Sequence, residues 1–443
     1  MESLRSIGKR LKGKFFHFLA HLLVAKSTLT RSKHNRALGT SANTVLHVNT
    51  FDRGGGAAKV ARDLFYSQQR SGLNSFLLVG TKKGQGSKVI QAKYEISFRE
   101  KILARLGLLE GYKELFAPSF LKDLHATIES KKVDILHLHN LHGSPGYFAL
   151  LDLVALKHPV KIVWTLHDMQ AFTGHCAHSF SCDKWSHQCG ACPALEAYPS
   201  LAIDVTAELL ALKATIYKNI DLQLVTPSDW LRQKVADSIM GHFPVQTIHN
   251  GVDVHVYQPQ DPMESRKSLK LPEDSKIVLF TAELGTDNPY KGGRFVLELA
   301  KKYENENILF VCLGAKKEST EANIKYVGYV NDETAIATYY SAADLFLYPS
   351  LADNCPLVVL EAMACELPVL CFNTGGIPEM VTHGETGYVA EYENGEDLVR
   401  GFDLLLTDPS SKEMGKKSRE RILANFTIEQ MNESYLKIYN DRG

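Results

Sequence analysis

The sequence predicts an α/β protein of two domains, because short apolar segments typical of buried strands alternate with helical segments along most of its 443 residues. A chain of this length is enough for about two to three domains. The pattern is clearest at residues 44–64 in the first half and at residues 344–389 in the second half. Each of these segments is typical of a strand that ends in a glycine- or proline-containing loop and is followed by a helix.

Composition narrows the class of protein. Apolar residues make up 44% of the chain and charged residues 23%, which is ordinary for a globular protein in water. The formal net charge of zero excludes a general attraction to nucleic acid, and eight cysteines in so long a chain do not indicate a secreted disulfide scaffold. No apolar run approaches the ~20 residues of a transmembrane helix. We therefore expect a cytoplasmic protein that does not bind nucleic acid.

The first 43 residues form a basic segment that differs from the rest. No acidic residue lies between Glu2 and Asp52, while nine lysines and arginines do, and residues 15–25 are mostly apolar. Such a segment is typical of a helix on an anionic membrane surface. A docking or solvated helix is an equal alternative. A secretion signal is the weakest one, because His17 and His21 interrupt the apolar core and no A-x-A site follows.

The glycine-rich loop at residues 54–56 follows the first predicted strand and opens a helix. Its spacing, Gly54-x-Gly56-x-x-Lys59, departs from the G-x-G-x-x-G fingerprint of dinucleotide-binding proteins. The acid expected after the second strand is also missing, since Thr81 and Lys82 stand there. The loop therefore argues against an NAD site and leaves either a tight turn or a phosphate approached by the backbone.

Histidines mark the ends of the next two predicted strands. His137 and His139 alternate with apolar residues, so both share one face of a strand, where hydrogen-bonded histidines are more common than metal ligands. His139 and His142 lie at the carboxyl end of that strand, where α/β sheets bind ligands, and are candidates for an acceptor side. His167, followed by Asp168, ends the strand that begins at residue 161.

Four cysteines cluster in the loop that follows. Cys176, Cys182, Cys189 and Cys192 lie within seventeen positions and end in C-x-x-C, which is typical of a thiolate zinc site. His175, His178 and His187 are alternative ligands, and free or redox-active thiols are the alternative to a metal. Four thiolates would leave no open position on zinc, so we expect the metal to be structural.

The second half carries an acid pair with a helical context. Asp353 precedes a predicted helix that starts near Pro356, and Glu361 lies eight positions after Asp353, one to two turns into that helix. Helical side chains lean toward the N-terminus, so Glu361 can point toward the crevice that holds Asp353. A helix N-terminus that faces the glycines at 375 and 376 suits a phosphate, and two carboxylates suit vicinal hydroxyls. A nucleotide-sugar offers all of these groups.

These motifs resemble the donor half of a retaining glycosyltransferase of family four, which has the GT-B fold of two Rossmann-like domains facing each other across a cleft. The family pattern is E-x7-E followed by G-G-x-x-E, and this chain has Asp353 in the first place and GGIPE at 375–379. The K-G of the family matches Lys291-Gly292, whereas its arginine is absent and Arg294 is the nearest substitute. Similar capsule and exopolysaccharide transferases share the cysteine-rich loop.

The resemblance implies a domain plan and a reaction. It places a basic segment at 1–43, an acceptor domain at 44–254, a donor domain at 255–425 and, at 426–443, a helix that crosses back to the first domain. The reaction is the transfer of a hexosyl group, with retention, from a nucleoside-diphosphate sugar to a growing glycan, which can be lipid-linked. Lysine replaces a catalytic metal, so no cofactor is needed. The alternatives are a nucleotide-sugar epimerase of the same architecture and a non-catalytic nucleotide-sugar-binding scaffold.

The resemblance also assigns residues. The catalytic candidates are His167, Lys291, Asp353 and Glu361, and the donor-binding candidates are Gly55, Gly56, Arg294, Asn354, Gly375, Gly376 and Glu379. Glu361 is expected to hold the ribose, Asp353 the sugar hydroxyls and Lys291 the diphosphate. No nucleophile is assigned.

Overall fold

The computed structural model describes residues 42–96, 98–105, 111–116, 119–143, 148–156 and 158–441. The basic segment at 1–43 lies outside this part, apart from its last two residues. The chain divides into two compact units: unit 1 comprises Met1–Ile248 and Asn432–Gly443, and unit 2 comprises His249–Met431. The predicted boundary after residue 254 falls a few residues beyond this division.

Unit 1 contains a seven-stranded parallel sheet in the order β3-β2-β1-β4-β5-β6-β7. The chain runs from β1 outward to β3 and then returns to β4 on the other side of β1, which makes the gap between β1 and β4 a topological switch point. Strands buried on both faces explain the apolar runs in the sequence. The strands are β1 (Thr44–Phe51), β2 (Asn74–Thr81), β3 (Val89–Gln91), β4 (Ile135–Leu138), β5 (Lys161–Thr165), β6 (Gln223–Thr226) and β7 (Val245–Thr247).

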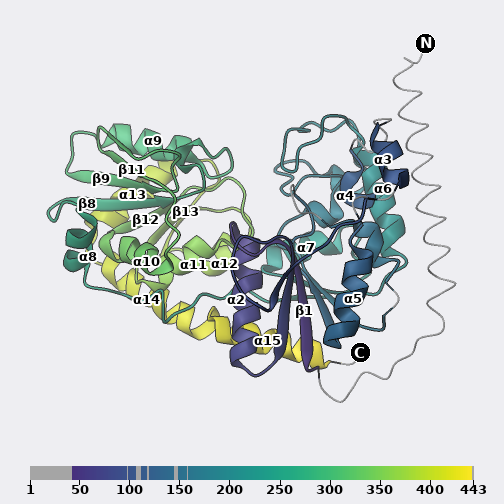
Figure 1. Ribbon diagram of the computed structural model, residues 1–443. Coiled ribbons are helices and arrows are strands. Elements are labelled where there is room, and N and C mark those ends of the chain that lie inside the picture. The colour runs from purple at the N-terminus through teal and green to yellow at the C-terminus, as the bar shows by residue number, and fades with distance from the viewer. Residues whose placement is uncertain are drawn as a thin grey trace, which may run out of the picture. The chain divides into compact units, whose positions relative to one another are not determined.

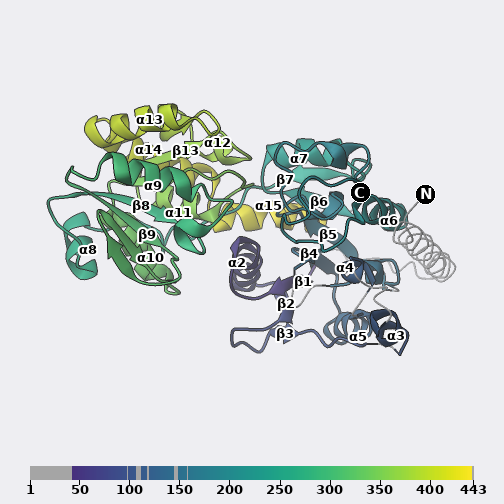
Figure 2. The same ribbon diagram turned by 90° about the horizontal axis from the view of Figure 1, so that it is seen from above.

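Helices cover both faces of this sheet. Figure 2 shows α2 (Gly56–Arg70) on one side of β1, β2 and β3, and α5 (Leu121–Lys131) on the other. α6 (Thr206–Tyr217) contributes to the same apolar cluster as α5. Ser228 caps the helix that begins at Asp229, because its hydroxyl accepts the Leu231 N–H at 3.1 Å. The remaining helices are α3 (Phe98–Arg105), α4 (Lys113–Phe116) and α7 (Asp229–Ala236), with 3₁₀ turns at Leu150–Leu153, Gln170–Phe172 and Lys184–Ser186.

Unit 2 repeats this plan with the sheet order β10-β11-β9-β8-β12-β13-β14. Only β10 runs antiparallel to its neighbour. The switch point lies between β8 and β12, so the two predicted Rossmann-like domains are confirmed. The strands are β8 (Lys276–Thr281), β9 (Ile308–Leu313), β10 (Ser319–Glu321), β11 (Ile324–Val327), β12 (Leu345–Tyr348), β13 (Val369–Phe372) and β14 (Gly387–Ala390).

The helices of unit 2 also form two layers, which Figure 1 shows above and below the sheet. α9 (Gly293–Lys302) and α13 (Gly395–Thr407) pack on one face through the apolar cluster around Phe310 and Phe402. α10 (Glu333–Ala342) packs on the other face, where Tyr340 meets Phe346 edge to face. The other helices are α8 (Pro262–Leu269), α11 (Leu357–Ala364), α12 (Ile377–Met380) and α14 (Ser411–Asn425), with a 3₁₀ turn at Gly285–Asp287.

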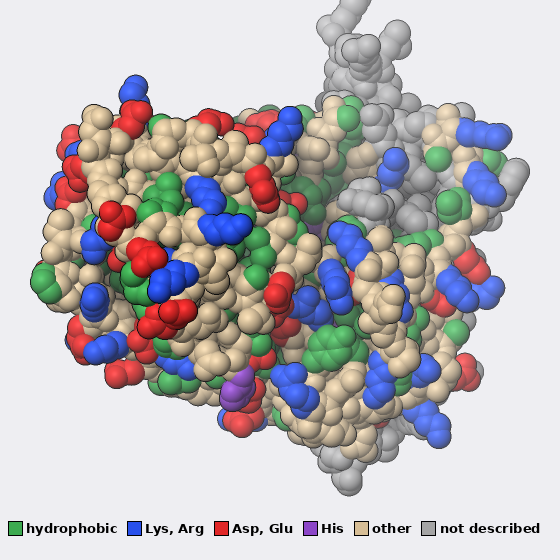
Figure 3. Space-filling model, turned by 60° about the vertical axis from the view of Figure 1, so that its left-hand side comes forward, with side chains coloured by type: hydrophobic (Ala, Val, Ile, Leu, Met, Phe, Trp, Pro, Cys, Tyr) green, Lys and Arg blue, Asp and Glu red, His purple; other side chains and the backbone are tan. Residues whose placement is uncertain are grey.

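The C-terminal helix α15 (Ile428–Asn440) begins in unit 2, and its residues from Asn432 onward belong to unit 1. None of the helices in the described ranges combines the length and the apolar character that a membrane crossing requires. Figure 3 shows acidic and basic side chains close together over the left-hand part of the face, whereas lysines and arginines predominate over its right-hand part.

Candidate active site

Three neighbouring strands of unit 2 lead into loops that carry several of the predicted donor-site residues. β8, β12 and β13 lie side by side in the sheet, and their carboxyl ends lead into the loops that carry Lys291, Asp353 and the Gly375-Gly376 pair. In parallel α/β sheets, ligands bind in the crevice at these ends. The local contacts described below bring the three loops together.

Gly292 explains how Lys291 reaches the end of β12. This glycine caps α9 with φ of 67°, and a Cβ atom there would lie 1.8 Å from the carbonyl oxygen of Pro349. Only glycine allows so close an approach in the left-handed region. The loop after β8 therefore lies directly against the residue that follows β12, which places the Lys291 ammonium beside Tyr348 and Asp353.

Lys291, Tyr348 and Asp353 form a hydrogen-bonded group that we call the Lys291 cluster. The Lys291 ammonium contacts Asp353 Oδ2 and lies 3.1 Å from the Tyr348 hydroxyl, which donates to the same oxygen at 2.6 Å. Burial and the Asp353 charge hold the pKa of Tyr348 well above its usual value, so this hydroxyl remains a donor. The side chains of Lys291 and Asp353 are 24% and 19% exposed, so both remain accessible to a ligand.

The Gly375-Gly376 loop packs against the same segment. Gly375 has φ of 57°, and a Cβ atom there would lie 1.7 Å from the carbonyl oxygen of Asp353. The Gly376 N–H donates to the carbonyl oxygen of the buried Asn354 at 2.9 Å. The predicted helix start is one position off, because α11 begins at Leu357 and Pro356 is its N-cap residue.

Glu361 has surroundings different from those of Asp353. It is 4% exposed, and its Oε2 accepts the Tyr340 hydroxyl at 3.2 Å. The Tyr257 hydroxyl hydrogen-bonds the same side chain, and burial together with the Glu361 charge raises the pKa of both tyrosines well above the usual value. The two predicted carboxylates therefore have separate hydrogen-bond partners.

Arg294 and Glu379 each lie near a residue outside the Lys291 cluster. The Arg294 guanidinium is 58% exposed, and its Nη2 lies 3.4 Å from Glu393 Oε1. Glu379, on α12, has Oε2 3.9 Å from His249 Nδ1. The structure thus pairs Arg294 with Glu393 in place of a member of the Lys291 cluster.

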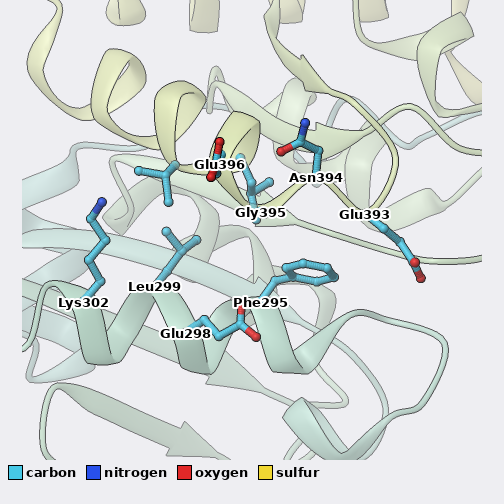
Figure 4. A pocket seen from close by; sticks show the side chains of 10 residues that line it. Phe295, Glu298, Leu299, Lys302, Glu393, Asn394, Gly395 and Glu396 are labelled. Carbon is cyan, nitrogen blue, oxygen red and sulfur yellow. The ribbon is translucent and has the colours of Figure 1, made fainter.

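A separate hollow in unit 2 lies between α9 and the start of α13 (Figure 4). Glu298, Glu393 and Glu396 line it, and Lys302 is the one basic side chain among its lining residues. Three carboxylates repel a diphosphate, so this hollow does not suit the donor. None of the predicted site residues lines it, as far as the described side chains show.

The glycine-rich loop of unit 1 follows β1. Gly55 caps α2 without a side-chain hydrogen bond, and Gly55 and Gly56 are exposed, with open space where a Cβ atom would stand. The buried Asp52 carboxylate accepts the backbone N–H groups of Lys83 and Gly84 at 2.6 and 2.7 Å, which ties this loop to the one after β2. The backbone at the two glycines can therefore be approached closely.

The histidines predicted at the ends of β4 and β5 lie together in unit 1. His139 Nδ1 is 3.1 Å from His167 Nε2, and His139 Nε2 is 3.0 Å from Nδ1 of the buried His47 on β1. Burial lowers the pKa of His167 to about 4, although the charge of Asp168 opposes this, and burial likewise keeps the pKa of His139 well below its usual value. These imidazoles are therefore neutral at pH 7.

His142 and His137 have other partners. His142 Nε2 lies 2.9 Å from an Asp168 carboxylate oxygen. Burial alone would raise the pKa of Asp168, but the charge and hydrogen bond of His142 lower it to about 2. His137 Nε2 contacts Thr165 at 2.8 Å and Nδ1 contacts the Tyr439 hydroxyl at 2.6 Å, which makes it a hydrogen-bonded core histidine as expected.

The cysteine-rich loop contains four free thiols. Cys192 Sγ lies 3.5 Å from His175 Nε2, and His175 Nδ1 lies 2.9 Å from the carbonyl oxygen of Pro199. Burial raises the pKa of Cys176 to about 11 and that of Cys189 above its usual value. Within the described residues, the loop does not bring three ligand atoms within 4.8 Å of one another. The zinc site remains a prediction, with His175 and Cys192 as the pair that the geometry favours.

Three residues of this geometry were not predicted from the sequence. Tyr348 belongs to the Lys291 cluster. The only sequence signal for it is its position at the end of a predicted strand, directly before the loop that carries Asp353. His47 shares the sheet face of His137 and His139, which strand alternation could have indicated. Gln68 lies on α2, and its Oε1 is 2.8 Å from His47 Nε2. No sequence motif indicates this residue.

Comparison with known proteins identifies the two units. Residues 54–256 match the family model described as Glycosyltransferase Family 4, and residues 261–421 match the model described as Glycosyl transferases group 1. The chain is 26% identical over 422 residues to the colanic acid biosynthesis glycosyl transferase WcaC of Escherichia coli (strain K12), covering 90% of this chain and 99% of WcaC.

Solved structures give the fold. A sucrose-phosphate synthase from Thermosynechococcus elongatus matches with a TM-score of 0.65 at 18% identity, over 90% of this chain and 98% of that one. Anabaena HepE in complex with UDP and glucose matches with a TM-score of 0.62 at 15% identity, over 90% and 99%. The predicted GT-B class is confirmed, and the epimerase alternative is not supported. The chain is a glycosyltransferase that combines a family 4 domain with a group 1 domain.

Proposed function

We propose that the protein transfers a hexosyl group from a nucleoside-diphosphate sugar to a growing glycan in polysaccharide biosynthesis, with retention of anomeric configuration. The Lys291 cluster at the carboxyl ends of β8 and β12 is the observation that carries this proposal, because it offers a cation and a carboxylate side by side. The name of WcaC supports a polysaccharide product, and the HepE complex with UDP and glucose supports the donor class.

The cluster suggests how the donor is held. Lys291 would exchange Asp353 for the diphosphate, whose negative charge grows as the sugar leaves. Asp353, released from the lysine, would then accept hydrogen bonds from the sugar hydroxyls. Glu361 would hold the ribose through its carboxylate, which hydrogen bonds from Tyr340 and Tyr257 keep in place.

The proposed reaction takes place at the anomeric carbon of the donor sugar. The anomeric carbon–phosphate oxygen bond breaks, the acceptor oxygen bonds to that carbon from the same face, and the diphosphate takes the acceptor's proton. No enzyme nucleophile and no metal are needed, because the lysine offsets the leaving-group charge. His167 would contact the sugar, and His142 would line the acceptor side. The buried His139, whose two ring nitrogens contact His47 and His167, would act on that side only through His167. The donor side would be lined by Gly55, Gly56, Arg294, Asn354, Gly375, Gly376 and Glu379.

The basic segment at 1–43 supports a proposal for the acceptor and the location. A lipid-linked glycan at the inner face of the membrane would suit a segment rich in lysine and arginine, which is attracted to anionic lipids. Removal of residues 1–42 is expected to abolish binding to anionic vesicles, and high salt is expected to weaken the binding of the full chain. Equal vesicle binding with and without the segment would leave the docking-helix alternative.

A structural zinc in the cysteine-rich loop is part of the proposal. A tetrahedral zinc with Zn–S of about 2.3 Å and Zn–N of about 2.0–2.1 Å holds sulfur and nitrogen about 3.6 Å apart. The 3.5 Å between Cys192 and His175 fits this separation. The contact of His175 Nδ1 with a backbone carbonyl is the usual partner of a ligating histidine and directs the Nε2 lone pair toward the thiol. Two of the three cysteines Cys176, Cys182 and Cys189 would supply the remaining two positions.

One experiment tests the function itself. The full chain is screened by thermal shift against a panel of nucleoside-diphosphate sugars with EDTA present, and the donors that bind are then offered with glycan acceptors. We expect a donor-dependent product whose new bond has the anomeric configuration of the donor, as read from proton NMR couplings. An inverted product would contradict retention, and binding without transfer to any acceptor would favour the scaffold alternative.

A further inference from the structure

We propose that Gln68 fixes the tautomer of His167 through a relay of two buried imidazoles, so that His167 presents Nδ1 as a hydrogen-bond acceptor. The residues come from four different elements: Gln68 from α2, His47 from β1, His139 from the end of β4, and His167 from the end of β5. Gln68 and the two intermediate histidines are positioning residues. Their effect on catalysis rests on the proposed function, in which His167 contacts the donor sugar.

The contacts form a continuous relay from His167 to Gln68. His167 Nε2 lies 3.1 Å from His139 Nδ1, His139 Nε2 lies 3.0 Å from His47 Nδ1, and His47 Nε2 lies 2.8 Å from Gln68 Oε1. Each of the two middle rings therefore uses both of its nitrogens. The rings of His139 and His167 are nearly parallel, with an interplanar angle of 18°.

A neutral imidazole carries one N–H donor and one acceptor nitrogen, so each contact determines the next. The rings are neutral, since burial lowers the pKa of His47 and of His167 to about 4. The Gln68 oxygen can only accept, so His47 must hold its proton on Nε2. His47 Nδ1 then accepts from His139 Nε2–H, and His139 Nδ1 accepts from His167 Nε2–H. The proton of His167 is thereby placed on Nε2, and Nδ1 is left unprotonated.

A second set of contacts is consistent with this orientation of the Gln68 amide. Its Nε2 donates to the Tyr439 hydroxyl at 3.1 Å, and the Ser75 hydroxyl donates to its Oε1 at 3.2 Å. Tyr439 can then donate to His137 Nδ1, and His137 Nε2–H to Thr165. Reversing the amide would reverse every donor in both sets, so one side chain sets the direction of the whole network.

The same histidines could be considered as a metal site, because ligand atoms of His47, His137 and His139 lie within 4.8 Å of one another. The hydrogen bonds argue against it. The facing nitrogens of His47 and His139 share one proton at 3.0 Å, whereas a metal requires lone pairs on both. Both nitrogens of His137 already contact hydroxyl groups. We therefore assign the cluster to the relay.

The tautomer has a consequence for substrate choice. An unprotonated Nδ1 attracts a hydroxyl donor of the bound sugar and repels a carboxylate or carbonyl oxygen in the same place. A neutral His167 also carries no positive charge that would stabilise a bound carboxylate. The relay therefore favours donor sugars that turn a hydroxyl toward His167, and disfavours uronic acid donors if their carboxylate occupies that place.

The test is the tautomer of His167 in the full chain labelled with ¹⁵N-histidine. Long-range ¹H–¹⁵N correlation at pH 7.5 distinguishes a protonated Nε2 from a protonated Nδ1, and the signals lost in His167→Gln assign the residue. We expect the Nε2-protonated form in the unmodified protein. A proton on Nδ1 would overturn the proposal, and this measurement needs no variant of the relay.

Variants of α2 test the origin of the tautomer. Gln68→Met removes the acceptor and is expected to give a mixture of both His167 tautomers, whereas the neighbouring Gln69→Met, whose side chain contacts only the backbone oxygen of Ser75 among the contacts described, should leave the signals unchanged. An unchanged His167 pattern in Gln68→Met would overturn the role of Gln68. Addition of a binding nucleotide-sugar separates the two proposals: His167 signals that do not respond would refute its contact with the sugar while leaving the relay intact.

Discussion

The ammonium group of Lys291 contacts the Asp353 carboxylate across sixty-two positions of sequence, and the Tyr348 hydroxyl bonds to the same oxygen. The lysine proposed to hold the diphosphate is therefore paired with the acid proposed to hold the sugar. Donor binding must exchange this ion pair for two new contacts. Because of this exchange, replacing Asp353 and replacing Lys291 should change the affinity for a nucleoside diphosphate in opposite directions.

Asp353→Asn should tighten the binding of a nucleoside diphosphate without sugar while lowering turnover of the complete donor. Loss of the partner charge frees Lys291, and a partly exposed ion pair contributes about 0.2–1 kcal/mol, so the affinity for the diphosphate should rise by at most about fivefold. Turnover should fall about tenfold or more, because a charged hydrogen bond to the sugar is lost. Calorimetry and initial rates check both, with Asp287→Asn, which breaks only an exposed pair with Lys316, as the control.

Weaker binding of the bare diphosphate to Asp353→Asn would contradict the exchange. Unchanged turnover of the full donor would contradict the contact between this carboxylate and the sugar.

Glu361→Gln should weaken donor binding about tenfold or more, since a hydrogen bond to a charged group contributes roughly 1.5–3 kcal/mol. The side chain is buried and accepts the Tyr340 hydroxyl, so Tyr340→Phe, which keeps the ring, serves as the control for the loss of this hydrogen bond alone. Circular dichroism confirms that each variant is folded. Calorimetry that finds the same affinity in Glu361→Gln as in the unmodified protein would refute the assignment of Glu361 to the ribose.

The buried histidines should make the protein sensitive to mild acid. The pKa of His47 and of His167 is about 4 in the folded state, below the ordinary 6.5 of the unfolded chain. As the pH falls from about 6.5 to 4, the unfolded state binds protons that the folded state does not, so the free energy of unfolding decreases. Each such histidine contributes a slope of about 1.4 kcal/mol per pH unit.

Urea unfolding between pH 4.5 and 7.5 measures this slope. His47→Gln should reduce it, whereas His255→Gln, at an exposed position, should not. A free energy of unfolding that stays constant over this range would show that the folded histidines take up protons as freely as the unfolded ones.

The zinc proposal predicts about one zinc per chain in protein purified without a metal-affinity step. His175→Gln should lower the zinc content severalfold, because His175 lies beside Cys192, while His178→Gln should retain it. Elemental analysis gives the metal content, and thiol titration of the native protein gives the number of reactive cysteines. Less than about a tenth of a zinc per chain in the unmodified protein, with all four loop thiols reacting, would refute the site.

The strands and most motif positions could be predicted from the sequence, because apolar runs and breakers reflect local physics. The K-G pair illustrates this: Gly292 has to be glycine where its backbone meets Pro349, and the lysine before it is directed to β12. The helix after Asp353 was placed within one residue for the same reason, since Pro356 restricts its own backbone.

What could not be predicted depends on contacts between distant segments. The hydroxyl of Tyr348 and the amide of Gln68 meet their partners only after the sheets have formed, and no spacing in the sequence marks them. The tyrosines that hold Glu361 come from residue 257 and from α10, far from the acid pair in sequence.

The most direct test of the central claim is calorimetric titration of nucleoside-diphosphate sugars, with EDTA present, into the unmodified protein and two lysine variants. We expect one donor molecule per chain, an affinity lowered about tenfold or more in Lys291→Ala, and an affinity changed less than twofold in Lys302→Ala, which alters the hollow between α9 and α13 (Figure 4). Failure of every nucleoside-diphosphate sugar to bind without a divalent ion, or equal losses in the two variants, would contradict the account.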